Sequence, residues 1–192
     1  MEHSFFAYIS RMRYIARWGL MRNTVQENIQ EHSHMVAVFA HALAVIRRDL
    51  FGGTADPGEV AVAALYHDAS EIFTGDLPTP VKYQNPDILE AYRKVENLAA
   101  DRLLSMLPPE LAPSYAPVLK ETDPEVTALV KAADKLSAYV KCLEELKAGN
   151  MEFKSAAQQT KKALTDLHSP ELDYFMTQLL PAFSLTLDEL QA

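Results

Sequence analysis

Four dipeptides that join a capping side chain to a proline constrain the fold of this chain more than any other feature. They are Asp56-Pro57, Asn85-Pro86, Asp123-Pro124 and Ser169-Pro170. Side chains of Asp, Asn and Ser accept hydrogen bonds from the free N–H groups at a helix start, and proline suits the first helical position because it has no N–H. Four such pairs in 192 residues predict a protein built of helices rather than strands.

The periodicity of apolar residues places the remaining helix boundaries. Asn28 followed by Glu31 resembles a capping box, and Gly149-Asn150 suits a helix end. We expect helices over 2–16, 29–49, 57–73, 86–106, 124–148, 151–167 and 170–180, with a short one near 186–191. The segment 74–85 contains two prolines and a glycine and is predicted to be a loop, whereas 107–122 is irregular or contains a short helix.

Length, charge and cysteine content narrow the class of protein. A chain of this length forms one sizeable hydrophobic core, so we expect a single domain over 1–192. The net charge of −8 argues against binding to a nucleic acid polymer. Cys142, the one cysteine, cannot form an internal disulfide, and no apolar run approaches the ~20 residues of a membrane span. The expected location is the cytoplasm, away from membranes.

Two segments, 35–46 and 60–66, are apolar on nearly every side and are predicted to be central helices. Charged groups at the ends of buried helices need a specific reason, because burying a charge without a partner is costly. His32 lies at the start of the first segment, and His67-Asp68 directly follows the second. A third helix brings Asp134 to its inner face, so the sequence places four possible metal ligands near the interior.

Two imidazoles and two carboxylates suit one divalent transition-metal ion, such as Co²⁺, Mn²⁺, Fe²⁺, Zn²⁺ or Cu²⁺. A metal held there can lower the pKa of a water molecule and polarise a phosphoryl group. Glu71 lies three residues after Asp68 and four after His67, so we expect it to share their helix face. Glu71 is therefore a candidate general base; the alternative is an exposed helix carboxylate.

The order of these residues is more specific than an isolated His-Asp pair. The sequence resembles the HD-domain superfamily of metal-dependent phosphohydrolases, and within it the bacterial 5′-deoxynucleotidases of the YfbR-like family. The resemblance runs from Phe5-Phe6 to Leu187-Asp188-Glu189. It rests on Arg17-Trp18, Glu31-His32-Ser33, His67-Asp68-Ala69-Ser70-Glu71 and Gly75-Asp76-Leu77-Pro78-Thr79-Pro80-Val81-Lys82.

This resemblance implies a compact multi-helix bundle with the metal between central helices, a homodimer, and hydrolysis of deoxyribonucleoside 5′-monophosphates to deoxynucleoside and phosphate. It implies metal ligation by His32, His67, Asp68 and Asp134, and catalytic roles for Glu71 and Arg17. The implied substrate contacts are Arg17, Trp18, His32, Asp68, Asp76, Leu77, Pro78, Thr79 and Asp134.

The residue types suit these roles. Arg17 offers a planar fork of donors to phosphate oxygens, although it also belongs to a group of arginines that could form a solvated helix face. Trp18 offers an apolar wall beside the 2′ carbon, or else a core anchor. Asp76 could accept a hydrogen bond from the 3′-hydroxyl or from a loop amide.

Two alternative functions stay open. The hydrolase could act on a cyclic nucleotide, an alarmone or a nucleoside triphosphate, although a triphosphate would require more cationic side chains near the loop than Arg17 and Lys82. The chain could instead be a catalytically silent helical module that binds nucleotides.

Overall fold

Helices make up nearly all the regular structure in the computed structural model, which describes residues 3–82, 85–120 and 123–191. In this part of the chain, the only β pairing is an isolated antiparallel bridge between Ala16 and Asn28. The predicted all-α class is confirmed.

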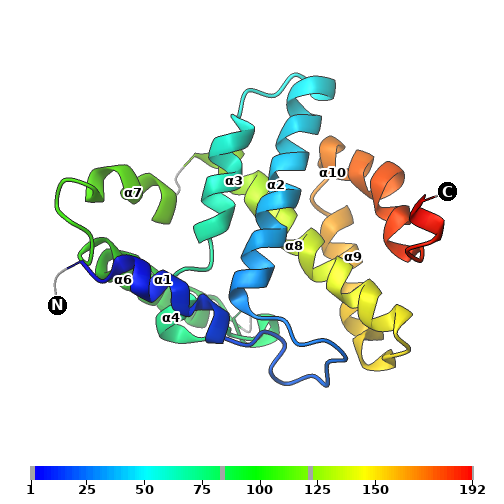
Figure 1. Cartoon of the computed structure of the whole chain (residues 1–192), viewed down its shortest axis with the longest axis horizontal. Coiled ribbons are helices and arrows are strands. Elements are labelled where there is room, and N and C mark those ends of the chain that lie inside the picture. Colours follow the sequence, from blue (N-terminus) through cyan, green and yellow to red (C-terminus); the bar gives the residue numbers. More distant parts are fainter. Residues whose placement is uncertain (1–2, 83–84, 121–122, 192) are drawn as a thin grey trace.

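The elements follow one another as in Figure 1. The first half contains α1 (Phe5–Ile9), the 3-10 helix η1 (Ser10–Tyr14), α2 (Ile29–Phe51), α3 (Pro57–Tyr66), α4 (Glu71–Thr74) and α5 (Thr79–Lys82). The second half contains α6 (Pro86–Leu104), α7 (Ala112–Leu119), α8 (Pro124–Lys147), the 3-10 helix η2 (Met151–Phe153), α9 (Lys154–Thr165) and α10 (Pro170–Tyr174). A π-helical turn, η3 (Phe175–Leu179), and the 3-10 helices η4 (Leu180–Ser184) and η5 (Glu189–Gln191) end the described chain.

Most predicted helix caps are present. Asn28 and Glu31 form the capping box of α2. At the starts of α3, α6 and α8, the side chains of Asp56, Asn85 and Asp123 accept hydrogen bonds from backbone N–H groups of the first helical turn. The predicted side-chain cap at Ser169 is wrong, because the hydroxyl accepts no hydrogen bond from the start of α10 and donates to the carboxylate of Glu171. Glu171 is almost fully buried, and a buried carboxylate requires hydrogen-bond partners.

The predicted continuous helix over 57–73 is wrong, since α3 ends at Tyr66 and α4 begins at Glu71. Between them, hydrogen bonds span three residues: the N–H of Ala69 donates to Tyr66 at 2.9 Å, and the N–H of Glu71 donates to Asp68 at 3.0 Å. Such bonds wind the backbone more tightly than an α-helix. The face that Glu71 presents is therefore set by this turn and not by α-helical spacing from His67.

The predicted loop over 74–85 also needs correction, because it contains the short helix α5. Its amide groups at Val81 and Lys82 donate to the carbonyl of Pro78 at 2.8 and 3.1 Å. Proline restricts φ to a helical value and is tolerated in a first helical turn, so the prolines here permit a short helix. The predicted helices 2–16 and 170–180 each begin as α-helix and continue as other helical turns.

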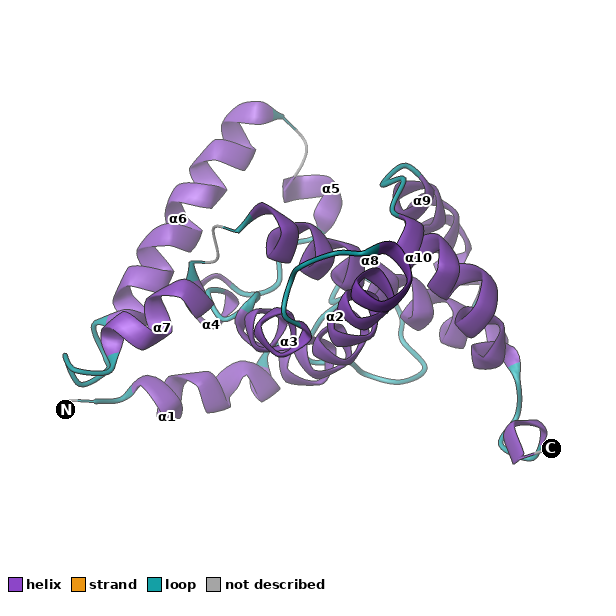
Figure 2. Ribbon diagram, turned by 90° about the horizontal axis from the view of Figure 1, so that it is seen from above, coloured by secondary structure: helices purple, strands orange, loops and turns teal. Residues whose placement is uncertain are grey.

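Helix α2 lies at the centre of the molecule, packed against α3, α8 and α10, and α8 packs in turn against α9 (Figure 1). The main core lies between α2 and α8, where Val36, Leu43, Leu129 and Leu136 are fully buried. Seen from above, α1, α6 and α7 lie to one side of these central helices, and α9 and α10 to the other (Figure 2).

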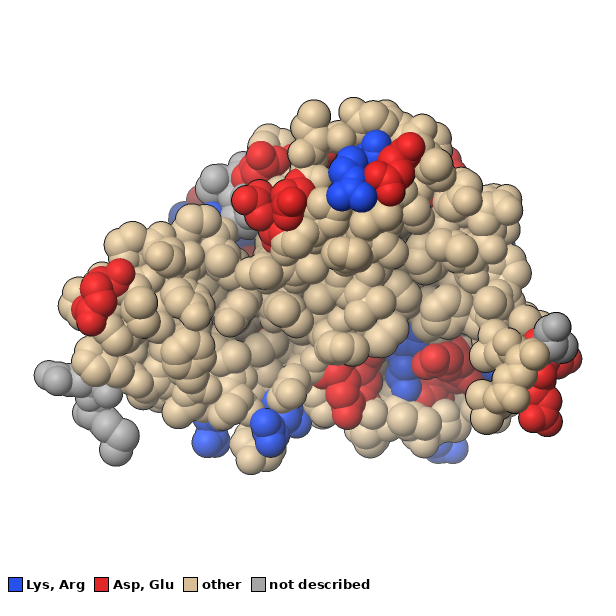
Figure 3. All heavy atoms as spheres, turned by 45° about the horizontal axis from the view of Figure 1, so that its top comes forward, with Lys and Arg blue, Asp and Glu red and all other residues tan. Residues whose placement is uncertain are grey.

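The central helices are not buried all round. Val38 on α2 is 47% exposed, and Val62 and Leu65 on α3 are 42% and 41% exposed. On the face drawn in Figure 3, most of the surface is uncharged, and lysines and arginines form small separate groups near acidic residues. No helix in the described ranges combines the length and hydropathy needed to cross a membrane.

Candidate metal and phosphate site

His32, His67 and Asp68 come together where the first turn of α2 meets the end of α3. One ligand atom from each of these residues lies within 4.8 Å of the other two. The Oδ2 atom of Asp68 is 3.6 Å from Nε2 of His32 and 3.2 Å from Nε2 of His67. The predicted convergence of these three residues is thus present.

His32 is fully buried, and both ring nitrogens have neighbours from α8. Its Nε2 lies 3.1 Å from Oδ1 of Asp134, and its Nδ1 lies 3.3 Å from Oγ of Ser137. Asp134 therefore borders the cluster through His32, with 40% of its side chain exposed.

His67 is oriented by the helix that it terminates. Its Nδ1 lies 2.7 Å from the carbonyl oxygen of Ala64, so Nδ1–H donates and the lone pair of a neutral ring is on Nε2. Nε2 is buried and forms no hydrogen bond of good geometry among the described residues, although Asp68 is close. A histidine that donates one ring N–H to a carbonyl and presents the other nitrogen is the usual arrangement of a metal ligand. The residues present fit a metal ion.

The charges in the cluster are strongly coupled. Burial opposes the charged form of His67, but the carboxylates of Asp68 and Asp134 raise the pKa of His67 to about 9. Burial alone would raise the pKa of Asp68, yet His67, His32 and Arg17 hold this pKa well below its usual range. In the protein without metal, a proton on His67 therefore offsets the negative charge of the carboxylates.

Glu71 begins α4 and points a buried carboxyl group toward the same region. The residue is 7% exposed, and its Oε2 has no hydrogen-bond partner among the described residues. Burial, followed by the charges of Asp68 and Asp76, raises the pKa of Glu71 to about 9, whereas Arg17 and Lys82 oppose this shift. The alternative of an exposed helix carboxylate is wrong for Glu71.

Arg17 lies beside the carboxylates of Asp68 and Asp76, with 12% of its side chain exposed. One Nη atom is 3.5 Å from Oδ2 of Asp68 and 3.8 Å from Oδ1 of Asp76. Burial lowers the pKa of Arg17, but the surrounding carboxylates of Asp68, Asp134 and Glu27 outweigh this effect and raise it. A permanently charged guanidinium thus borders the candidate metal cluster, where an anionic group could bind.

Trp18 is placed both to anchor the core and to form an apolar wall, the two roles expected from the sequence. Its ring centroid lies 5.3 Å from that of Phe153, so part of the indole packs against the core. The side chain is only partly buried, which leaves the remainder free to form a wall. Burial raises the pKa of Asp76, and the positive charge of Arg17 and the nearby backbone amide of Trp18 oppose this rise.

The predicted substrate loop is only partly described. Asp76, Leu77 and Pro78 are half-buried between α4 and α5, whereas the side chain of Thr79 lies outside the described part of the structure. Residues that the sequence did not single out are Glu27, which binds Arg17 and Trp18, and Ser137, which contacts His32. The spacing of Ser137, three residues after Asp134 on one helix, could have indicated it.

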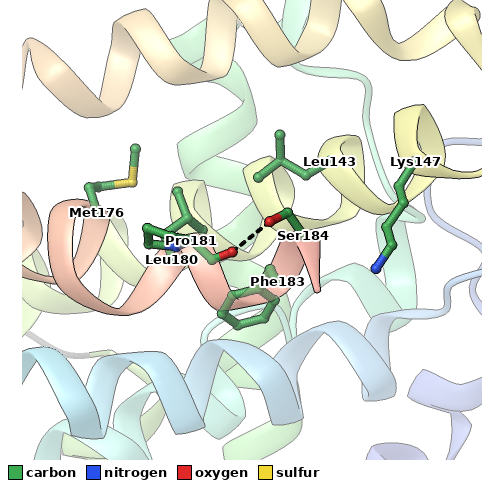
Figure 4. A pocket seen from close by; sticks show the side chains of 7 residues that line it. All are labelled: Leu143, Lys147, Met176, Leu180, Pro181, Phe183 and Ser184. Carbon is green, nitrogen blue, oxygen red and sulfur yellow. Dashed lines mark hydrogen bonds between the residues drawn. The ribbon is translucent and has the colours of Figure 1, made fainter. Parts of the chain in front are cut away.

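A separate apolar pocket of about 260 Å³ lies between α8 and η4 (Figure 4). It is lined by Leu143, Lys147, Met176, Leu180, Pro181, Phe183 and Ser184. Lys147 donates to the carbonyl of Leu185, and Ser184 donates to the carbonyl of Pro181. The polar side chains that line the pocket are therefore bonded to backbone carbonyls of the C-terminal segment. None of the predicted site residues lines this pocket.

Comparison with protein families gives a match to the model described as "5'-deoxynucleotidase YfbR-like" over residues 4–183. A 5′-deoxynucleotidase of Photorhabdus laumondii is 53% identical, over 99% of this chain and 97% of the relative. One of Vibrio cholerae is 51% identical, over 98% of each chain.

Solved structures share the fold. An HD-domain phosphohydrolase of Listeria innocua superposes with a TM-score of 0.82 at 22% identity, covering 99% of this chain and 92% of that one. The HD phosphohydrolase of cyanophage S-2L, whose structure contains dA and one catalytic Zn²⁺ ion, has a TM-score of 0.66 at 23% identity. The match covers 97% of this chain and 100% of that one. The HD-domain bundle predicted from the sequence is confirmed.

Proposed function

Because the chain belongs to the YfbR-like 5′-deoxynucleotidase family, we propose that it hydrolyses deoxyribonucleoside 5′-monophosphates at the cluster around His67. The observation that carries the assignment of this site is the buried Nε2 of His67, which lies beside Asp68 and forms no hydrogen bond of good geometry. This nitrogen could bind a metal ion, which would then lie near the guanidinium of Arg17.

A divalent transition-metal ion would be held by His32, His67, Asp68 and Asp134. Two nitrogen and two oxygen donors support Co²⁺, Mn²⁺, Fe²⁺, Zn²⁺ or Cu²⁺, and the HD phosphohydrolase of cyanophage S-2L binds one catalytic Zn²⁺ ion. When bound, such an ion supplies positive charge that makes an adjoining water more acidic and a phosphoryl oxygen more electron-poor.

The side chains of this chain perform the remaining steps. Arg17 donates from its Nη atoms to phosphate oxygens and offsets the charge that builds on them in the transition state. Glu71 takes a proton from the attacking water as the new P–O bond forms. The bond between phosphorus and O5′ breaks, and the proton passes to O5′ of the departing deoxynucleoside. A nearby cation would lower the pKa of Glu71 from its value of about 9 and favour the ionised form that accepts this proton.

The sugar would lie beside Trp18 and the loop that begins at Asp76. The exposed part of the indole supports an apolar wall against the 2′ carbon, which would discriminate modestly against a ribose hydroxyl. Leu77, Pro78 and Thr79 would complete this side of the site. His32, Asp68 and Asp134 would also contact the phosphate, because they surround its proposed position.

The activity is tested by phosphate release from matched deoxy- and ribonucleoside monophosphates, with and without EDTA and added metals. A cyclic nucleotide, an alarmone and a triphosphate belong in the panel. We expect deoxynucleoside monophosphates to be preferred and EDTA to abolish turnover. Faster hydrolysis of another member would identify that substrate instead, and metal binding without any hydrolysis would support the silent module.

Glu71→Gln tests the role of the carboxyl group. It preserves shape but cannot take up a proton, so we expect turnover to fall by about 10²–10⁴-fold while metal content is unchanged. Glu90→Gln, on the exposed face of α6, is the matched control. Normal turnover in Glu71→Gln protein would exclude proton transfer by this residue.

The assembly and location are further proposals. The exposed apolar side chains of Val38, Val62 and Leu65 on α2 and α3 support a homodimer, which sedimentation would test. We also propose a single domain over 1–192 and a cytoplasmic location, the latter supported by the charge and by the single unpaired cysteine.

A further inference from the structure

We infer that Glu27 is a positioning residue that holds Arg17 and Trp18 together in the orientation the site requires, an inference that rests on the proposed function. One carboxylate oxygen of Glu27 accepts a hydrogen bond from Nε of Arg17 at 3.2 Å and another from Nε1 of Trp18 at 3.0 Å. These two donors belong to the residues proposed to meet the phosphate and the sugar. A single oxygen atom therefore links both halves of substrate recognition.

For Arg17, the bond to Glu27 sets the direction of the guanidinium. The group is planar, so fixing Nε also fixes the plane in which the Nη donors lie. The Nη side then faces Asp68 and Asp76 at 3.5 and 3.8 Å. Without Glu27, no group in the described part of the chain would hold Nε, and the plane of the guanidinium could rotate while one Nη stays near these two carboxylates.

For Trp18, Glu27 holds the indole on an unusual backbone. Trp18 has φ of 57°, in the left-handed region that bulky residues rarely occupy. Local hydrogen bonds retain this conformation, since the carbonyl of Trp18 accepts from the N–H of Met21 at 2.9 Å and from the side chain of Asn23 at 3.3 Å. The bond from Nε1 to Glu27 then orients the ring, whose other contacts within the described ranges are packing contacts such as that with Phe153.

Glu27 is itself anchored where α2 begins. Its carbonyl accepts from the N–H of Arg17 at 2.9 Å, and Ala16 pairs with Asn28 in the isolated bridge. Asn28 caps α2, the helix that carries His32. With 15% of its side chain exposed, Glu27 thus joins the arginine and the indole to the frame that holds a proposed metal ligand.

The first test uses intrinsic fluorescence, because Trp18 is the only tryptophan in the chain. In Glu27→Ala protein, with or without metal, we expect a red-shifted emission maximum and stronger quenching by acrylamide. Glu27→Gln keeps an oxygen acceptor and should restore most of the native spectrum. Glu90→Ala, which removes an exposed carboxylate from α6, is the control. A native spectrum in Glu27→Ala protein would overturn the inference for Trp18.

The second test separates positioning from general stability. With a deoxynucleoside monophosphate, we expect Glu27→Ala to lower kcat/KM by about 10- to 100-fold, the range for a hydrogen bond to a charged group, and to lower the deoxy-to-ribo preference. In an Arg17→Ala background, Glu27→Ala should lower kcat/KM by a much smaller factor, because the arginine that Glu27 positions is already absent. Fully additive losses would overturn the inference for Arg17, and a melting temperature near that of the wild type would confirm that each variant folds.

The two hypotheses fail in different ways. Wild-type protein that hydrolyses none of the nucleotides would refute the proposed function, yet the fluorescence of Glu27→Ala would still decide whether Glu27 holds Trp18. Active wild-type protein with an unchanged Glu27→Ala variant would refute the positioning role alone.

Discussion

The Nδ1 atom of His67 lies 2.7 Å from the carbonyl oxygen of Ala64, three residues earlier in the chain. Carbonyl groups at a helix end lack intrahelical partners, and here the imidazole supplies one for the last turn of α3. The same contact directs Nε2 toward Asp68. The end of α3 thus stabilises both the helix terminus and the orientation of a metal ligand.

Removal of His67 should abolish metal binding. In His67→Ala protein we expect metal content, measured by elemental mass spectrometry, to fall from about one ion per chain to near zero, because a structural or catalytic site seldom retains its ion after losing a ligand. Hydrolysis should fall with it. His34→Ala, which removes an exposed histidine from the same helix as His32, is the control. Full metal content in His67→Ala protein would contradict the site.

Metal binding should release a proton from His67. Its pKa of about 9 without metal means that the ring is protonated at neutral pH, and a ligand histidine must be neutral. We expect apparent affinity to rise as the pH rises toward 9, and calorimetry in buffers of different ionisation enthalpy to detect the proton. Affinity that does not change over pH 6.5–9 would contradict this.

The same shift affects the stability of the metal-free protein. A pKa raised from 6.5 to about 9 contributes stability that is fully present below 6.5 and is lost as pH rises through 9. In His67→Ala protein this contribution is absent, so comparing urea unfolding of the two metal-free proteins across this range isolates it.

Loss of the hydroxyl of Ser137 should weaken metal binding without abolishing it. Ser137 is buried and lies 3.3 Å from Nδ1 of His32, so it orients a ligand that it does not replace. We expect Ser137→Ala to weaken metal affinity by about 10- to 100-fold, measured by competition with a chelator. Ser155→Ala, on the exposed face of α9, should have no effect. Unchanged affinity in Ser137→Ala protein would remove this role.

Glu145 should be among the most important residues for stability. It is 1% exposed, pairs with Lys141, and accepts hydrogen bonds from Thr24 and Asn150. Glu145→Ala would leave the ammonium group of Lys141 buried without its partner, so we expect a loss of about 3–5 kcal/mol in unfolding free energy. Glu144→Ala, at the exposed neighbouring position, is the control for urea unfolding.

Lowering the pH should destabilise the protein through the carboxyl group of Glu145. Burial opposes the ionised form of Glu145, but hydrogen bonds from Lys141, Thr24 and Asn150 hold its pKa well below the usual value of 4.5. The contribution to stability is therefore present above 4.5 and is lost as pH falls toward the folded pKa. Glu145→Ala protein should lose less stability than wild type when the pH is lowered from 5 to 3, a range set by these pKa values.

Most of the helix caps can be predicted from the sequence because they are local. Asn28 and Asp123 cap helices through residues two or three positions away, so the chain itself brings the partners together. The break at His67 cannot be predicted in this way. Apolar periodicity continues through it, and only the hydrogen bonds of the folded turn end the helix there.

The sequence by itself determined most of the helices, the family and the donor types at the site, since these depend on local spacing and on residue chemistry. Only the tertiary structure decided which atoms face one another. Ser137 meets His32 from 105 positions away, and Glu27 reaches Arg17 and Trp18 across a folded loop. Such contacts depend on how α2 and α8 cross and how the loop closes, and these are set by side-chain packing throughout the core. Glu71 owes its position to the same packing, because the turn after Tyr66, and not helical spacing from His67, directs its carboxyl group inward.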